Sequence, residues 1–156
     1  MATKILILCI GNILLMDEGV GPRVAQELLS RPDLPESVVV LDRGSMGMAL
    51  ISDFKTADII LVVDAVDQTG LAPGTVVRFK PEDIAASESF HGAHDTRLGD
   101  VLEALRLLGY SPQVDCLGVQ IENMTPPEYC LELTPAVEAA VPVLVQSVLE
   151  YIEARS

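Results

Sequence analysis

The sequence of 156 residues contains few basic side chains. Ten Lys and Arg stand against 23 Asp and Glu, so the formal net charge is −13 at pH 7. A charge of this sign and size disfavours a nucleic-acid backbone or an anionic membrane as the partner. It is compatible with a partner that carries basic residues or a metal ion.

Cysteine is scarce as well. The three cysteines, Cys9, Cys116 and Cys130, are odd in number and form no Cys-x-x-Cys pair. Cys9 and Cys116 lie in apolar runs, where a cysteine serves as a small core residue. We therefore expect a protein of the reducing cytoplasm.

Long apolar runs, linkers, repeats and low-complexity tracts are missing too. No apolar run approaches the roughly 20 residues that span a bilayer, and the N-terminus enters a strand-like segment without a cleavable signal. With 49% hydrophobic residues, the chain is long enough to bury a sizeable core. We expect one domain over residues 1–156, with no membrane as a partner.

The segments that are present predict an α/β fold. Short, continuously apolar runs are typical of strands in a sheet that is covered on both faces; they are Ile5–Ile10, Val38–Leu41, Ile59–Val63, Thr75–Phe79 and Val114–Val119. Helical spacing of apolar residues follows around 22–30, around 97–108 and from Thr134-Pro135 onward. We predict a single three-layer α/β/α domain with a mostly parallel, twisted sheet of about five strands.

Phosphate-binding and nucleophile motifs are not found. Gly11, Gly19 and Gly21 follow the first strand, but their spacing is not G-x-G-x-x-G. The adjacent acids Asp17 and Glu18 would repel a pyrophosphate. No Walker A lysine and no Gly-x-Ser-x-Gly elbow occurs, so a nucleotide site is disfavoured.

Acidic residues instead collect where three of the predicted strands end. The carboxyl ends of parallel strands are where functional groups gather in an open sheet. Asp17-Glu18 follows the first strand, Asp42 ends the second and Asp64 ends the third. Structural alternatives remain open for each: Asp17 or Glu18 caps the first helix, Asp64 accepts backbone N–H groups, and Asp42 belongs to a turn.

The only two histidines, His91 and His94, lie in one polar segment. His94 precedes Asp95-Thr96, which we expect to begin a helix. An imidazole near a helix N-terminus stays neutral and available as a ligand, whereas His91 is expected to face solvent. Two carboxylates and one imidazole suit Zn, Ni, Mn or Co ions, although no spacing motif establishes a metal.

The stretch "GNILLMDEGVGP" resembles the N-terminal signature of the [NiFe]-hydrogenase maturation endopeptidases, approximately G-N-x-L-x-x-D-[DE]-G-x-G. The resemblance continues, in order, through "LDRGSMG", "VVDAVD", "PGTVVRF", "HDTRLGDVLEAL", "LGVQIE" and "LTPAVEAAVP". It thus covers nearly the whole chain. Arg43, where glycine is common, and Ile121, where proline is frequent, depart from the family pattern.

This resemblance implies an endopeptidase that removes the C-terminal extension of a hydrogenase large-subunit precursor after nickel insertion. It places the metal contacts, which are also the catalytic residues, on Glu18, Asp64 and His94, with Ni²⁺ supplied by the substrate. Asp42 would take part in substrate recognition. Asn12 and the glycines would shape a turn that Asp17 braces.

Two other readings stay open at this point. One is a non-catalytic chaperone or binding module that senses metal in a metalloenzyme precursor. The other is a self-contained metallohydrolase that keeps its own ion.

Overall fold

The computed structural model describes residues 3–44, 50–86, 91–92 and 95–156. The strands are β1 (Ile5–Ile10), β2 (Val38–Arg43), β3 (Ile59–Asp67), β4 (Val76–Phe79), β5 (His91–Gly92) and β6 (Gln113–Gln120). The helices are the 3-10 helix η1 (Met16–Gly19), α1 (Val20–Leu29), α2 (Ile51–Phe54), α3 (Pro81–Ala86), α4 (Asp95–Leu107) and α5 (Pro135–Glu153).

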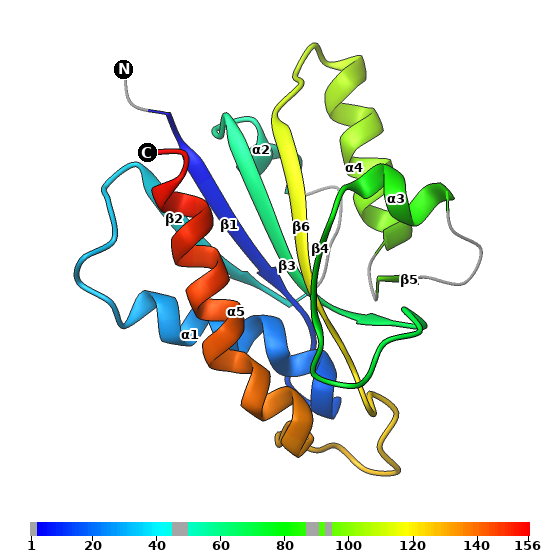
Figure 1. The fold of residues 1–156 in the computed structure, drawn as a ribbon. Coiled ribbons are helices and arrows are strands. Elements are labelled where there is room, and N and C mark those ends of the chain that lie inside the picture. Colours follow the sequence, from blue (N-terminus) through cyan, green and yellow to red (C-terminus); the bar gives the residue numbers. More distant parts are fainter. Residues whose placement is uncertain (1–2, 45–49, 87–90, 93–94) are drawn as a thin grey trace.

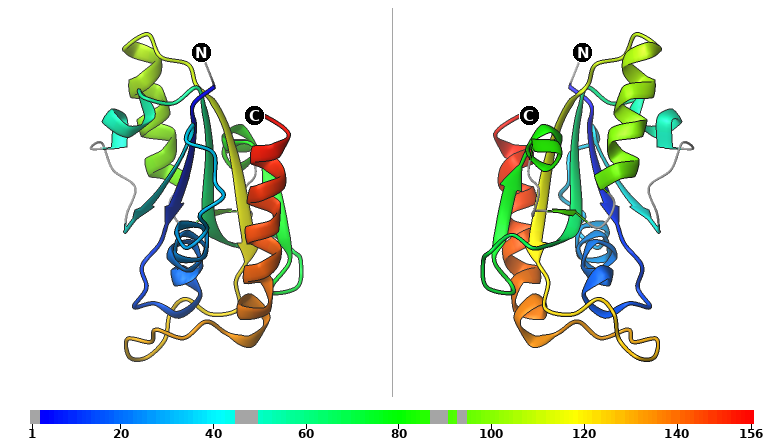
Figure 2. Two further views of the ribbon diagram at one scale, coloured as in Figure 1. Left: turned by 90° about the vertical axis from the view of Figure 1, so that its left-hand side faces the viewer. Right: turned by 90° about the vertical axis from the view of Figure 1, so that its right-hand side faces the viewer.

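The strands form one sheet in the order β2-β1-β3-β6-β4, and β5 pairs with β3 outside this path. The pairs β1–β2, β1–β3 and β3–β6 are parallel, whereas β4 and β5 run antiparallel to their neighbours. Helices cover both faces of the twisted sheet (Figures 1 and 2): α1 and α5 lie on one side, α2 and α4 on the other. The predicted three-layer α/β fold with a mostly parallel sheet is therefore confirmed.

Each face of the sheet has its own hydrophobic core, because side chains alternate along a strand. Ile5, Ile7 and Cys9 of β1 pack with α1 and α5. Leu6, Leu8 and Ile10 pack with Phe54 of α2 and with three residues of α4, which are Leu98, Val101 and Leu105. This alternation fixes which face each later side chain occupies.

The predicted elements are present, with shifted ends. The first strand has the predicted bounds, and β2, β3 and β6 extend further than their apolar runs. Gly109 ends the α4 segment with a φ of +88°, a conformation that favours glycine. Four elements, η1, α2, α3 and β5, are too short to produce a periodic pattern and were not predicted.

Helix α5 qualifies the expectation that no segment is able to span a bilayer. Its 19 residues are long and apolar enough to cross a membrane by length and composition alone. However, eight of them are buried, among them Val141, Leu144 and Val148, and they belong to the core beside α1. A core helix passes the same test, so the segment is weak evidence for a membrane span.

Candidate functional site

The turn after β1 depends on close backbone packing. Gly11 has a φ of +148°, and a Cβ built on it would lie 1.9 Å from the carbonyl oxygen of Glu18. A Cβ on Gly21 would lie 2.2 Å from the carbonyl oxygen of Ile10. The Asn12 side chain accepts a hydrogen bond from the Leu14 N–H at 2.9 Å, which is an Asx turn. These contacts confirm the predicted turn and hold η1 against the carboxyl end of β1.

We expect Gly21→Ala to destabilise the protein by about 1–3 kcal/mol, because the new methyl group meets backbone that cannot move aside. Gly99→Ala in α4 is the matched control, since a Cβ there meets nothing within 4 Å. That control should gain about 0.5–1 kcal/mol from the better helix propensity of alanine. Urea denaturation measures both changes, and equal stability of the two variants would contradict the packing argument.

Asp17 is completely buried at the start of the site. Its Oδ2 accepts the backbone N–H groups of Glu122 and Asn123 at 2.9 and 3.0 Å. Its Oδ1 accepts the backbone N–H of Thr134 at 2.8 Å, and the Thr134 hydroxyl donates to the same carboxylate. Asp17 therefore ties η1 to the segment after β6 and to the beginning of α5.

This arrangement decides between the alternatives for Asp17. The N-cap of α1 is Gly19, so the helix-cap reading is wrong and the bracing role is confirmed. Thr134 does occupy the N-cap position of α5, but it makes no side-chain capping bond because its hydroxyl points to Asp17.

Asp64 lies inside β3 rather than at its end, because the strand continues to Asp67. The β1–β3 register stops at the pair Cys9–Val63, so Asp64 is the first residue of β3 past the end of that register. Alternation with Val62 puts its side chain on the α2–α4 face. It is only 7% exposed, and its Oδ1 accepts the Ala65 N–H at 2.8 Å.

Glu18, the other predicted carboxylate, is half-buried in η1. Because η1 contacts β3, the structure brings the elements that carry Glu18 and Asp64 together, beyond the carboxyl end of β1. His94 lies outside the described residues. Among the residues that are described, no group of three Asp, Glu, His or Cys side chains is placed to hold a metal ion.

The buried cysteines do not extend this set of ligands. Burial, followed by the negative charge of Asp64, raises the pKa of the Cys116 thiol to about 12. Burial and then the charge of Asp42 raise the pKa of Cys9 well above its usual range. Both side chains therefore remain neutral thiols, as expected for small core residues, and a thiol is a poor metal ligand.

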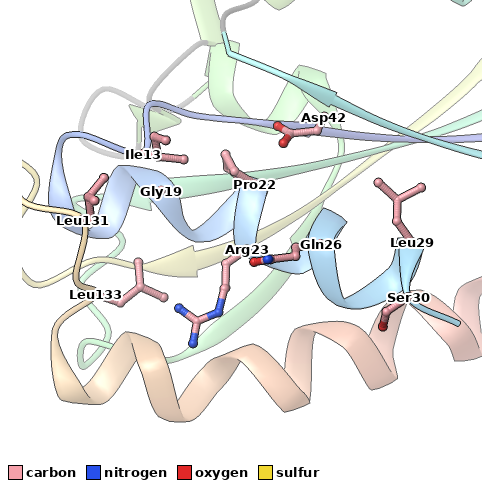
Figure 3. Close-up of a pocket in the computed structure, with 10 residues that line it drawn as sticks. All are labelled: Ile13, Gly19, Pro22, Arg23, Gln26, Leu29, Ser30, Asp42, Leu131 and Leu133. Carbon is pink, nitrogen blue, oxygen red and sulfur yellow. The ribbon is translucent and has the colours of Figure 1, made fainter.

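Asp42 is not on the same face of the sheet as Asp64. It pairs in register with Cys9, which belongs to the α1–α5 face. It is exposed and lines a groove of about 660 Å³ beside α1 (Figure 3). The structure therefore places the predicted recognition residue across the sheet from Asp64.

Other singled-out residues have structural roles. Arg43 forms an ion pair with Asp53 of α2 at 3.2 Å, and Ile121 is buried in the core. Asp67, at the end of β3, is half-buried and accepts a hydrogen bond from Gln120 Nε2 at 3.1 Å.

The groove itself was missed by the sequence reading. The signal was a set of apolar residues in loops where polar ones are expected, in "NILL" and "CLEL". In the structure Ile13 and Leu131 of these stretches are exposed and line the groove together (Figure 3).

Comparisons with known proteins agree with one another. Residues 22–151 match the family described as hydrogenase maturation protease. The Hydrogenase 2 maturation protease of Escherichia coli K12 is 37% identical over 148 residues, which cover 94% of this chain and 88% of that protein. The solved structure of the hydrogenase maturating endopeptidase HybD from E. coli superposes with a TM-score of 0.83 at 36% identity, over 97% of this chain and 93% of that one.

A more distant structure supports the fold. The [NiFe] hydrogenase maturation protease HybD from Thermococcus kodakarensis has a TM-score of 0.80 at 24% identity, over 96% of this chain and 99% of that chain. At this identity the likeness concerns the architecture of the chain.

Proposed function

This chain belongs to the hydrogenase maturation protease family and is a hydrolase, an endopeptidase; from this premise we propose that it removes the C-terminal extension of a nickel-loaded [NiFe]-hydrogenase large-subunit precursor. One observation carries the proposal. Two carboxylate residues, Glu18 and Asp64, lie on contacting elements beyond the carboxyl end of β1, the region of an open parallel sheet where substrates bind.

We propose that Glu18, Asp64 and His94 recognise the nickel ion of the precursor and that the ion arrives as part of the substrate. Two carboxylates and a neutral imidazole are suitable ligands for a divalent ion of this kind. Three ligands shared with a substrate metal bind weakly in its absence, so productive docking would be restricted to the loaded precursor.

Hydrolysis requires a base for the attacking water and a proton for the amine that leaves. The water oxygen forms a bond to the scissile carbonyl carbon, the C–N bond breaks, and the proton taken from the water passes to the amine. We assign the base to one of the two carboxylates, which would accept the water's proton either directly or after the substrate's metal has made that water more acidic. Asp64 is only 7% exposed, and this burial strengthens the interaction of its charge with a proton or with the substrate's metal ion.

Asp42 has a different role in this proposal, because it is on the opposite face of the sheet from Asp64. We assign it to substrate recognition, away from the bond that is cut. We further propose that the protein acts in the cytoplasm on a protein partner, with neither nucleic acid nor membrane involved. The reading as a non-catalytic metal sensor is disfavoured, since the family consists of proteases.

The experiment is incubation of the purified protein with nickel-loaded and nickel-free precursor, followed by mass spectrometry of both. We expect the loaded precursor to lose the mass of its extension and the nickel-free precursor to remain intact. A complex that forms without any loss of mass would overturn the proposal in favour of the metal sensor.

A further inference from the structure

The groove beside α1 is the feature that the proposed cleavage site leaves unexplained. Its apolar walls come from α1 and from two neighbouring loops, the one after β1 and the one before α5 (Figure 3); they include Ile13, Pro22, Leu29, Leu131 and Leu133. Its volume of about 660 Å³ lies within the range of roughly 300–1,000 Å³ that is usual for ligand sites. We propose that this groove binds the precursor's C-terminal extension as an extended peptide with apolar side chains and a basic residue opposite Asp42.

The position of the groove supports this occupant, on the premise of the proposed function. Gly19 lines the groove and directly follows Glu18 in η1. The groove lining therefore begins one residue from Glu18, where we place the scissile bond. Asp42 lines the same groove from the end of β2 (Figure 3).

The walls of the groove expose large apolar side chains to water, which is unfavourable without a bound partner. Leu29 is 60% exposed, Leu131 67% and Ile13 53%. Large apolar side chains gathered around one concavity mark interaction sites, whereas scattered ones do not. A bound segment would remove these side chains from water.

The charged side chains of the groove favour a bound peptide that carries a basic residue. Among the described residues that line it, Arg23 is the one cationic side chain, and it is already paired with Glu138 of α5. Asp42 is exposed and forms no ion pair with any other residue in the described parts of the chain. In a chain with a net charge of −13, this leaves the Asp42 carboxylate as the unpaired charge of the described lining, complementary to Arg or Lys.

The two loops that form the groove are held together before any ligand binds. The Cys130 N–H donates to the Leu14 carbonyl at 2.8 Å, and the Met16 N–H donates to the Cys130 carbonyl at 3.0 Å. Asp17 adds its bonds to Thr134 close by. A preformed groove loses little conformational entropy on binding, which favours a short peptide ligand.

The test measures binding separately from cleavage. The probe is a fluorescein-labelled synthetic peptide with the sequence of the extension encoded in the same genome, and anisotropy gives its Kd. Leu29→Gln and Leu131→Gln should each weaken binding about tenfold, as expected for the loss of one buried leucine contact. Leu107→Gln is the matched control, because Leu107 is 75% exposed on α4, outside the groove.

Asp42→Asn should also weaken binding, and the difference from the unaltered protein should shrink at high salt, because exposed charges are screened. Asp33→Asn, an exposed acid outside the groove lining, should leave the Kd unchanged. In the processing assay the leucine variants should raise KM for the precursor and leave kcat near its normal value.

The outcomes separate this inference from the proposed function. Equal Kd for the unaltered protein and all groove variants would overturn the groove assignment even where processing is normal. If the groove substitutions weaken peptide binding but the unaltered protein does not process loaded precursor, the groove assignment stands and the cleavage proposal is overturned. A change of oligomeric state in Leu131→Gln would assign the groove to a second copy of the chain and overturn the inference.

Discussion

Glu18→Gln and Asp64→Asn should each slow the processing of nickel-loaded precursor by about 10²–10⁴-fold, the usual contribution of a charged group in proton transfer or metal contact. The amide replacements preserve size and shape but remove the negative charge that we assign to metal recognition or to the base. The fraction of precursor that loses its extension, followed by mass spectrometry over time, gives the rates.

The controls for this prediction are Glu36→Gln and Asp33→Asn, which remove one charge each from exposed positions outside the groove. Both should process the precursor at the normal rate, which shows that a change in net charge alone has no effect. Thermal unfolding of Asp64→Asn should show a folded protein, because removing a buried charge relieves its desolvation cost. Normal rates in both Glu18→Gln and Asp64→Asn would contradict the assignment of the site.

The layers and strand positions followed from the sequence because they depend on local patterns. Continuous apolar runs specify strands covered on both faces, and the first of them agrees with β1 at both ends. Where strands extended further, as in β3, Asp64 continues the strand because β6 pairs with residues 59–66, and Asp67 continues it because β5 pairs with residues 66–67. Such pairing depends on distant residues and leaves no local signal.

The site could be predicted only in part, for the same reason. The pair Asp17-Glu18 predicted two acids with different roles, but the partners of Asp17 lie more than 100 positions away, at Glu122, Asn123 and Thr134. Likewise, the face on which Asp42 lies depends on its register with Cys9. The sequence therefore suggested which acids matter, and the long-range contacts decided what each one touches.

Asp17→Asn should reduce the free energy of unfolding by about 2–5 kcal/mol. The buried carboxylate accepts several hydrogen bonds, and the amide replaces one of its two acceptor oxygens with a donor. One oxygen of the carboxylate would be replaced by an NH₂ group that faces either the Thr134 donors or the N–H groups of Glu122 and Asn123. Two donors then meet without an acceptor between them. Urea denaturation measures the loss.

Thr134→Val is the graded comparison, since it removes only the hydroxyl donor and leaves the Thr134 N–H bond to Asp17. We expect a smaller loss of about 0.5–3 kcal/mol for this single hydrogen bond to a charged group. Hydrogen exchange should accelerate at Glu122 and Asn123 in Asp17→Asn and remain slow there in Thr134→Val. Slow exchange at these amides in both variants would contradict the bracing role.

The same brace has a consequence for catalysis, because Asp17 and Glu18 are neighbours in η1. Once η1 is released from the segment after β6, Glu18 loses its fixed position relative to Asp64, and small errors of placement are costly in catalysis. Asp17→Asn should therefore process loaded precursor more slowly even at temperatures where it is fully folded, whereas Thr134→Val should stay close to normal. Normal processing by folded Asp17→Asn would limit the residue to a purely stabilising role and would show that Glu18 is positioned by the Gly11 and Gly21 contacts alone.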